Sequence, residues 1–345
     1  MVELDGAYGE GGGQILRTGL ALASILKVPV RVVNIRANRK NPGLKPQHVM
    51  CVQALAALTN ASVVGGKINS MEVVFEPKTL RSGEFSFNVA DLKSSAGSVT
   101  LILQALLPPL LYGPERSRVM IRGGTHVEWS PPVHYLLHVF LPTVLKMGAH
   151  GSMNLTRWGW YPKGKGTVTI DVEPLQELIP VHLEQRGALE ALRGLSVSSK
   201  LPMMISKRQR RKGDQLLREA GYDAQIRMFE TPASCPGTIF FLWAEFENSR
   251  AGFSTLGRRG RPAEEVAGST VRQFLEFMDS GAAVDEHLAD QLVIYMALAQ
   301  GQSSIVTSRI TQHLLTCIWV VEQFLPVKFE VEGSEGEGGK VTRIT

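Results

Sequence analysis

The feature that most restricts the fold of this chain is a recurrence of its helix starts. A glycine-rich segment around Gly11 and a small-residue segment at 94–98 (SSAGS) each follow a predicted strand and precede a predicted helix. Gly97 follows Gly11 by 86 positions, and Pro131 follows Pro46, the start of another predicted helix, by 85 positions. Similarity at a fixed period is typical of repeated supersecondary units. We therefore predict two copies of one βαβαββ unit, in approximately residues 1–78 and 79–174.

Hydrophobic periodicity and turn residues predict the elements of both copies. In the first copy we expect strands at 2–4, at 30–35 and near 62 and 73, with helices ending at 26 and spanning 46–58. In the second we expect strands at 85–89, 119–122, near 152 and at 167–172, a helix that ends at 111 and a helix from about 131. The two copies thus have the same predicted order of elements.

A third copy is predicted near the C-terminal end, where residues 279–291 lead into one helix and His313 begins the next. His313 follows Pro131 by 182 positions, about 97 more than the repeat spacing. An excess of this length has the size of a small domain. We place the insertion at 187–279, with strands at 189–198, 224–230, 238–247 and near 253, and helices at 207–220 and 262–277.

The predicted fold class is therefore α/β (α+β). Three repeated βαβαββ units are expected around a pseudo-threefold axis, and a small inserted α/β sandwich domain interrupts the third unit. The remaining parts of that unit are residues 175–186 and 280–345, which end in strands at 327–331 and 340–344. Helix starts from three such units can converge on one face and offer their free N–H groups to anions.

Composition narrows the class of protein. A chain of 345 residues with 44% hydrophobic residues can bury sizeable cores, and a net charge of +5 weakly favours a polyanionic partner. The three cysteines, Cys51, Cys235 and Cys317, lack metal-ligand spacing, which argues against a disulfide framework or zinc site and favours a reducing cytoplasm. We find no apolar run long enough for a bilayer and no secretion signal, so we expect a soluble cytoplasmic protein without a membrane partner.

His313 is the candidate nucleophile. A β-rich segment at 304–308, the polar residues Thr311 and Gln312, and apolar residues at helical spacing predict that the imidazole lies at a helix N-terminus. Free N–H groups and the helix dipole there favour an anion and disfavour the imidazolium. A neutral imidazole beside a phosphate can act as a nucleophile. The alternative is a capping or core histidine, which is the commoner role for a single histidine.

Two segments have the residues of phosphate-binding loops. Residues 9–17 (GEGGGQILR) lie between a strand and a helix and bring Glu10, Gln14 and Arg17 to one helix start, without the spacing of a Walker A or Rossmann loop. Arg36 and Arg39 lie in a cationic loop with Lys40 and Lys45, just before Gln47, and arginine suits bidentate phosphate contacts. In both cases the alternative is a solvated surface turn.

The third unit and the insertion contribute further candidates. Asp290 and Gln291 follow a predicted helix start and could face His313, where a carboxylate fixes a tautomer or binds a divalent ion; an ordinary helix carboxylate is the alternative. Phe253 and the arginines at 258, 259 and 261 could cover a base, or Phe253 could be a core residue. The basic run at 207–212 could contact RNA backbone or begin a solvated helix.

Together these segments resemble the RNA 3'-terminal phosphate cyclase family. The resemblance rests on LDGAYGEGGGQILR at 4–17, IRANR at 35–39, NPGL at 41–44, QH at 47–48, Gly97, Gln104, GGT at 123–125, SPP at 130–132, GWYPKGKG at 159–166, LADQL at 288–292 and HLLT at 313–316. It covers almost the whole chain and is weakest in the insertion. It implies three repeated βαβαββ units with an inserted α/β domain, as the spacing arithmetic does.

The resemblance also implies a reaction. RNA with a 3'-phosphate end is converted to a 2',3'-cyclic phosphodiester, with ATP consumed and AMP and pyrophosphate released. A histidine first attacks the α-phosphate of ATP, AMP then passes to the RNA 3'-phosphate, and the neighbouring 2'-hydroxyl displaces it. Such a sequence divides one difficult dehydration into steps with good leaving groups.

The resemblance assigns roles by matching position. His313 is the adenylylated residue, and Glu10 is at a position that binds a divalent cation, Mg²⁺ or Mn²⁺. The expected phosphate and RNA contacts are Gln14, Arg17, Arg36, Arg39 and Gln47. The expected nucleotide contacts are Gln104, Pro131, Phe253, His287, Asp290 and Gln291. A homodimer is left open.

The chain departs from the family pattern at a few positions. His287 replaces a common aromatic residue, His126 and His134 replace acidic residues, and Lys165 replaces a usual glycine. Two other functions remain as alternatives. One is a non-catalytic RNA-binding scaffold of ribosome biogenesis with the same fold, whose members lack the nucleophilic histidine. The other is an enolpyruvyl transferase, which resembles this family in its repeated units.

Overall fold

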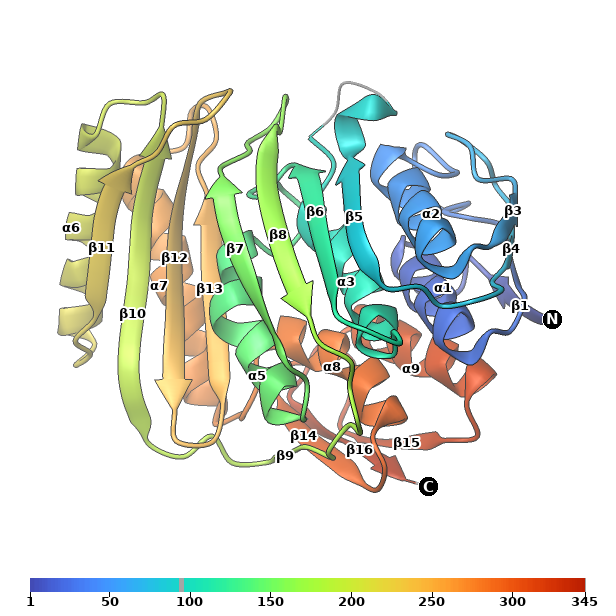
Figure 1. Cartoon of the computed structure of the whole chain (residues 1–345). Helices are drawn as coiled ribbons and strands as arrows, with labels where there is room; N and C mark the ends of the chain where they lie inside the picture. The colour runs from blue at the N-terminus through green and yellow to red at the C-terminus, as the bar shows by residue number, and fades with distance from the viewer. Residues whose placement is uncertain (93–95, 345) are drawn as a thin grey trace.

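The computed structural model describes residues 1–92 and 96–344. Ser94 and Ser95 of the predicted small-residue segment lie outside the described residues. Within these ranges the chain forms four mixed sheets of four strands each, with helices packed against them (Figure 1). The class is therefore mixed α and β, as predicted. Among the described residues no helix has both the length and the apolar character needed to span a bilayer.

The sheets are built from segments that follow one another along the chain. The first contains β1 (Val2–Asp5), β2 (Val30–Val33), β4 (Val73–Glu76) and β3 (Ser62–Val64), in that order. The second contains β5 (Gly83–Asn88), β6 (Ser117–Gly123), β8 (Gly166–Val172) and β7 (Gly151–Arg157). The third contains β9 (His182–Leu183), β14 (Ser303–Thr307), β16 (Gly339–Ile344) and β15 (Lys328–Glu332). The fourth contains β11 (Gln225–Glu230), β10 (Leu189–Ser199), β12 (Gly237–Phe246) and β13 (Arg250–Leu256).

Helices connect and cover these sheets. They are α1 (Gln14–Leu26), α2 (Pro46–Thr59), the 3₁₀ turn η1 (Val89–Asp91), α3 (Val99–Leu111), α4 (Val133–Tyr135), the π-helical turn η2 (Leu136–Phe140), α5 (Leu141–Lys146), α6 (Met204–Glu219), α7 (Ala263–Ser280), α8 (Glu286–Leu298) and α9 (Gln312–Phe324). Most agree with the predicted ranges to within a few residues. The helix expected from about 131 begins at Val133 and is divided by the π turn, and the two-residue strand β9 is too short to give a sequence signal.

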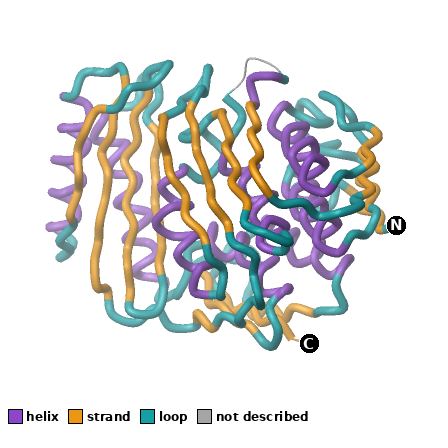
Figure 2. The backbone as a smooth tube through the Cα atoms, viewed as in Figure 1, coloured by secondary structure: helices purple, strands orange, loops and turns teal. Residues whose placement is uncertain are grey.

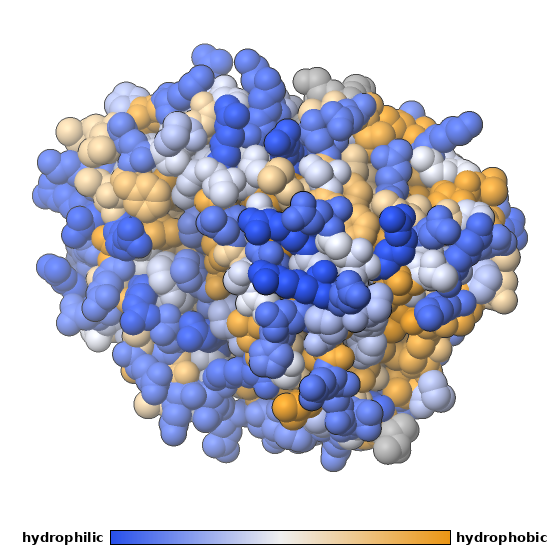
Figure 3. Space-filling view, in the orientation of Figure 1, coloured by the Kyte–Doolittle hydropathy of each residue, from blue (hydrophilic) through white to orange (hydrophobic). Residues whose placement is uncertain are grey.

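The site depends on a group of helices that lie between the sheets (Figure 2). Helix α1 contacts α2, α3 and α9, and α8 contacts α3 and α9. Because α1 and α3 are buried around most of their circumference, they carry apolar residues on nearly every face. Strand β6 instead alternates, with Val119 and Ile121 buried against the helices and Arg118 and Arg122 exposed. The face that Figure 3 shows is accordingly hydrophilic over much of its area.

The fourth sheet packs on both of its faces. On one face Phe240, Phe253 and Phe274 belong to a core shared with α6 and α7. On the other face Phe241 and Trp243 join the main core of the chain. Burial of these large apolar side chains is the principal stabilising contribution at both contacts.

His126 and His134, two of the departures from the family pattern, lie where the fourth sheet packs against the main core. His126 Nε2 and His134 Nδ1 lie 2.9 Å apart, and His126 stacks on Trp158 with ring centroids 4.2 Å apart. His138 stacks on Trp243 at 4.1 Å. Burial lowers the pKa of His126 well below its usual range, that of His134 to about 3 and that of His138 to about 4, so the rings pack in their neutral forms.

Mild acid is expected to destabilise the fold through this cluster. The unfolded chain takes up a proton on each histidine near pH 6.5, whereas folded His134 resists protonation until about pH 3. Its stabilising contribution is therefore complete above pH 6.5 and falls as the pH decreases, by about 2 kcal/mol at pH 5. The free energy of unfolding of the parent and of His134→Gln should be measured in urea at pH 7.5 and at pH 5. Between these two pH values the decrease in His134→Gln should be about 2 kcal/mol smaller than the decrease in the parent. His150→Gln, at an exposed histidine, should match the parent, and an unchanged pH effect in His134→Gln would refute the assignment.

Candidate active site

Two helix starts bring the main candidates together. Helix α9 begins at Gln312 and is capped by Thr311, whose Oγ1 accepts a hydrogen bond from the Leu314 amide at 3.1 Å. His313 is therefore the second residue of α9, which confirms its predicted place at a helix N-terminus. Helix α1 begins at Gln14, directly after the glycine-rich segment, and packs along α9.

Glu10 is the contact between these two helix starts. Its Oε2 lies 2.8 Å from Nε2 of His313, and its Oε1 accepts a hydrogen bond from Arg39 Nη2. The His313 side chain is 46% exposed and that of Glu10 is 32% exposed, so both groups are open to a ligand. One carboxylate thus holds the predicted nucleophile and a predicted phosphate-binding arginine.

The charges of this cluster are coupled. The hydrogen bond from His313 is the main reason that the pKa of Glu10 falls to about 2; partial burial opposes the shift, and the charges of His313 and Arg39 add to it. The same hydrogen bond raises the pKa of His313, helped by Asp290 and opposed by partial burial and by Arg17. In this arrangement the proton stays on the imidazole. A nucleophilic His313 therefore requires the Glu10 carboxylate to be drawn away from Nε2.

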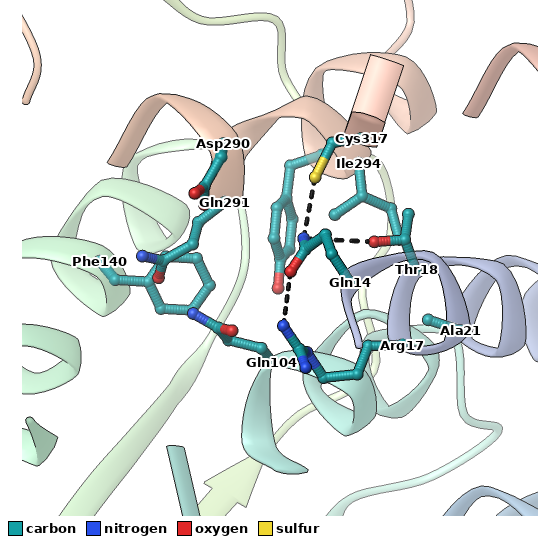
Figure 4. Close-up of a pocket in the computed structure, with 11 residues that line it drawn as sticks. Gln14, Arg17, Thr18, Ala21, Gln104, Phe140, Asp290, Gln291, Ile294 and Cys317 are labelled. Atoms are coloured by element: carbon teal, nitrogen blue, oxygen red, sulfur yellow. Dashed lines mark hydrogen bonds between the residues drawn. The ribbon is translucent and has the colours of Figure 1, made fainter. Parts of the chain in front are cut away.

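Arg17 and Gln14 form one wall of a small pocket at the start of α1 (Figure 4). Arg17 Nη2 donates to Gln14 Oε1 at 2.6 Å, and Gln14 Nε2 donates to Cys317 Sγ at 2.8 Å. The Arg17 side chain is buried, which lowers its pKa, but a guanidinium keeps its charge in proteins. The pocket therefore contains a fixed positive charge.

The opposite wall comes from α3 and α8. Gln104, Asp290 and Gln291 line it and face Gln14 and Arg17 (Figure 4). Burial raises the pKa of Asp290 to about 6, although His287, His313 and Arg17 oppose the shift. The free space is about 30 Å³, which is room for a water molecule or a phosphate oxygen rather than a nucleotide.

Three buried polar atoms around this pocket have no hydrogen-bond partner in the part of the chain that the structure describes. They are Arg17 Nε, Gln291 Oε1 and the Tyr295 hydroxyl. Buried polar atoms in native proteins are rarely left unsatisfied, and those that are need an explanation such as a bound water or ligand. A water molecule or a polar ligand atom in this space would satisfy these donors and this acceptor.

Arg36 and Gln47 make contacts within the protein. Arg36 Nη1 donates to the carbonyl oxygens of Asn41 and Gly43, at 2.8 and 3.0 Å, and so fixes the shape of the cationic loop. Gln47 Oε1 accepts a hydrogen bond from the Ser98 amide at 3.2 Å, which links α2 to the start of α3. Neither residue lines the pocket that contains Arg17.

The other predicted nucleotide contacts, Pro131, His287 and Phe253, do not line the pocket that contains Arg17. The Pro131 carbonyl accepts a hydrogen bond from Thr100 Oγ1 at 2.8 Å, which holds this segment against α3. The His287 side chain is 61% exposed at the start of α8. Phe253 is only 6% exposed and packs edge-on against Phe274. It is therefore a residue of the second core, which was the alternative to a base-covering role.

Asp285 is a residue whose importance the sequence analysis missed. It is buried before α8 and accepts hydrogen bonds from the Tyr135 hydroxyl at 2.7 Å, the Gly252 amide at 3.1 Å and the amides of His287 and Leu288 at 3.0 Å. It thereby fixes the helix that carries Asp290. An aspartate directly before a helix is a sequence signal for an N-cap. No sequence signal indicates its contacts with Tyr135 and Gly252, which lie in distant segments of the chain.

The glycine-rich segment is packed tightly at one position. A Cβ atom on Gly13 would lie 2.3 Å from His48 Nε2 and 2.9 Å from Arg17 Nη1, whereas a Cβ atom on Gly12 would come no closer than 3.5 Å to any neighbour. Gly13→Ala is therefore expected to displace Arg17 and lower the catalytic rate of this candidate site by about 10-fold or more, since displacements near 1 Å cost up to 10²-fold. Gly12→Ala is the matched control and should retain activity in the same steady-state assay. Equal rates in the two variants would contradict the prediction.

Comparisons with known proteins identify the family. Residues 8–331 match the family described as RNA 3'-terminal phosphate cyclase. The RNA 3'-terminal phosphate cyclase of Gloeothece citriformis is 43% identical over 327 residues, which cover 94% of this chain and 93% of that protein. The proteins of that name from Pyrobaculum neutrophilum and Pyrococcus furiosus are 42% and 41% identical, and cover 96% and 99% of this chain and 95% and 98% of their own lengths.

One solved structure resembles the fold of this chain only slightly. It is that of the enolpyruvyl transferase NikO from Streptomyces tendae, with 11% identity, a TM-score of 0.37, and coverage of 99% of this chain and 47% of its own. The extent of the sequence matches, in contrast, assigns the chain plainly: it belongs to the RNA 3'-terminal phosphate cyclase family.

Proposed function

We propose that this enzyme converts the 3'-terminal phosphate of RNA into a 2',3'-cyclic phosphodiester with ATP, and releases AMP and pyrophosphate. The observation that carries the proposal is the position of His313, half-exposed at the start of α9, beside Glu10 and near the pocket that contains Arg17. Relatives over 40% identical carry the name of this activity. The charge of Arg17 and the free N–H groups of the helix starts suit phosphate groups.

The chemistry proceeds in three balanced steps. The imidazole of His313 attacks the α-phosphorus of ATP, an N–P bond forms, and pyrophosphate leaves with the bridging oxygen. An oxygen of the RNA 3'-phosphate then attacks the same phosphorus, the N–P bond breaks, and a phosphoanhydride joins RNA and AMP. Finally the 2'-hydroxyl attacks the 3'-phosphorus, loses its proton and displaces AMP.

Glu10 governs the first step in this mechanism. Its hydrogen bond raises the pKa of His313. Glu10 would be the residue that holds a divalent cation, and the charge of that ion would weaken the hold of the carboxylate on the imidazole. The residues fit such an ion only in part, since no group of three or more His, Cys, Asp or Glu side chains among the described residues could form a cage. Mg²⁺ and Mn²⁺ suit sites with one carboxylate and substrate phosphates, which is the arrangement that Glu10 would offer.

The other side chains hold the two substrates. Arg17 and Arg39, with Gln14, contact phosphate oxygens, while Arg36 and Gln47 act by fixing the loops around them. Gln104, Asp290 and Gln291 contact one edge of the nucleotide, because their pocket is too small to enclose it. Pro131 and His287 do not line this pocket, and Phe253 belongs to the second core.

The arrangement of the sheets supports the repeated units and the inserted domain. We infer three repeats, at about 1–78, 79–174 and 175–186 with 280–345, around a pseudo-threefold axis, and an inserted domain at 187–279. In support, the first three sheets of the described chain share one pattern: in chain order the first strand pairs parallel with the second, the second antiparallel with the fourth, and the fourth antiparallel with the third. Cytoplasmic location and a homodimer stay predictions.

The test is an assay on the parent protein with α-labelled ATP and Mg²⁺ or Mn²⁺. Without RNA, denatured protein should retain acid-labile label. Addition of RNA with a 3'-phosphate should discharge the label and yield an end that resists phosphatase, whereas the same RNA with a 3'-hydroxyl should do neither. A protein that binds RNA but takes no label would refute the proposal and favour the non-catalytic RNA-binding scaffold.

A further inference from the structure

An unusual tryptophan lies outside the site described above. The Trp129 side chain is 96% exposed, although burial of an indole is strongly favourable, and its backbone has a φ of +63°. A bulky residue in this left-handed region is strained by roughly 1–2 kcal/mol. No hydrogen bond or ring contact joins the Trp129 side chain to the part of the chain that the structure describes. Its conformation therefore has a cost that no internal contact offsets.

The segment around Trp129 is held on both sides. Ser130 Oγ donates to the Val127 carbonyl at 3.1 Å, and Thr100 Oγ1 donates to the Pro131 carbonyl at 2.8 Å. His126 forms a backbone bridge with Trp160. The indole is thus presented on a fixed support, which lowers the entropic cost of binding a flat ligand.

A cavity lies beside this indole. It has a volume of about 390 Å³ and lies between the 127–132 segment and the edge formed by β13 and α7. Trp129 lines it, with Ser254, Thr255, Arg258 and Gln273 on the other side. We call it the Trp129 cavity. Its volume falls in the range of small-ligand sites, and its lining combines one flat aromatic ring with several hydrogen-bonding groups.

The charges at the rim favour a singly charged nucleotide unit. The Arg258 guanidinium is exposed and makes no hydrogen bond or ion pair within residues 1–92 and 96–344, whereas the Arg261 guanidinium donates to Glu265 at 3.1 Å and to Ser269 at 2.6 Å. One available guanidinium suits one phosphodiester. Glu128, also at the rim, opposes a polyphosphate and can accept a hydrogen bond from a base amino group or a 2'-hydroxyl.

A chain of contacts joins the cavity to the pocket that contains Arg17. The cavity segment continues to Pro131, which Thr100 anchors at the start of α3, and Gln104 stands one helical turn farther along α3 in the pocket with Arg17. A strand that contacts both the active site and the cavity would follow this segment.

We propose that the Trp129 cavity binds a nucleotide of the RNA strand on the 5' side of the reacting end. The base stacks on the Trp129 indole and the adjoining phosphodiester pairs with Arg258. Stacking on an aromatic ring accepts any base, so this site holds RNA without selecting its sequence. The inference rests on the proposed function for its substrate and adds a binding site to it.

The test compares Trp129→Asn, which tolerates the left-handed backbone, with Trp129→Phe, which keeps an aromatic ring. Stacking contributes about 1–3 kcal/mol per base, so Trp129→Asn should raise the KM for a 3'-phosphorylated RNA pentamer by about 5-fold to 150-fold. Trp129→Phe should restore most of the loss. Arg258→Gln should raise the KM and weaken its dependence on salt. RNA-independent labelling of the protein by ATP should stay unchanged in all variants.

Other outcomes would overturn the proposal. An unchanged KM for the pentamer in Trp129→Asn would exclude an RNA contact. A raised KM for ATP in the labelling step, with the RNA step unaffected, would assign the cavity to the base of ATP. Fluorescence anisotropy of a 5'-labelled pentamer gives the Kd without catalysis, so a Kd unaffected by Trp129→Asn refutes this site whether or not the enzyme cyclises RNA.

Discussion

Replacement of His313 by alanine is expected to abolish covalent labelling by α-labelled ATP and to lower RNA cyclisation by at least about 10³-fold. The physical reason is that, in the proposed mechanism, the imidazole of His313 forms the bond to phosphorus. Label on denatured protein and phosphatase resistance of the RNA end measure the two effects.

The loss should reflect chemistry rather than folding. The His313 side chain is 46% exposed and Thr311, not His313, caps α9, so the main loss in His313→Ala is the partly exposed contact with Glu10, and the free energy of unfolding should stay within about 1 kcal/mol of the parent. His150→Ala, at an exposed histidine outside the site, is the matched control and should label fully. Label that persists in His313→Ala would keep the enzyme class and refute the nucleophile.

A preformed RNA–adenylate separates the steps further. If His313 acts only in nucleotide transfer from ATP, RNA that already carries the 5'-AMP anhydride at its 3'-phosphate should be cyclised by His313→Ala at a rate within about 10-fold of the parent, because the 2'-hydroxyl step needs no histidine nucleophile. A variant that fails with this substrate as well would show that His313 also serves the last step.

The sequence predicts the elements well where periodicity is strong and leaves the contacts between them open. Helix α9 and the place of His313 follow from a polar cap before apolar residues at helical spacing, which is a local signal. The hydrogen bond between Glu10 and His313 joins residues about 300 positions apart, and no local signal describes it. The repeat spacing predicted that their helix starts converge on one face, but it did not predict a contact between these two side chains.

Phe253 and Asp285 are two further residues whose tertiary contacts could not be predicted from the local sequence. An aromatic residue beside arginines could stack on a base or fill a core, and the choice depends on which face of β13 meets α7. Asp285 looks like an ordinary helix cap, yet its partners Tyr135 and Gly252 come from two other elements. Sequence periodicity fixes which face of an element is apolar, but tertiary packing decides what that face meets.

Replacement of Asp285 by alanine is expected to lower the free energy of unfolding by about 4 kcal/mol. Loss of the N-cap contributes about 1 kcal/mol, and the Tyr135 hydroxyl and Gly252 amide, left buried without an acceptor, contribute about 1–3 kcal/mol each. The change corresponds to a Tm lower by roughly 5 °C for a chain of this length. Urea unfolding and thermal melts measure it.

The matched variants separate the charge from the hydrogen bonds. Burial raises the pKa of Asp285, so the charge itself is costly and Asp285→Asn, which keeps one acceptor oxygen without the charge, should lose about half as much stability as Asp285→Ala. Asp279→Ala, at an exposed position near the end of α7, should stay within about 0.5 kcal/mol of the parent. Because Asp285 fixes the start of α8, and α8 carries Asp290 and Gln291, the KM for ATP should rise in Asp285→Asn even at temperatures where the variant is folded. A folded Asp285→Asn with the parent's KM would show that the pocket does not depend on this cap.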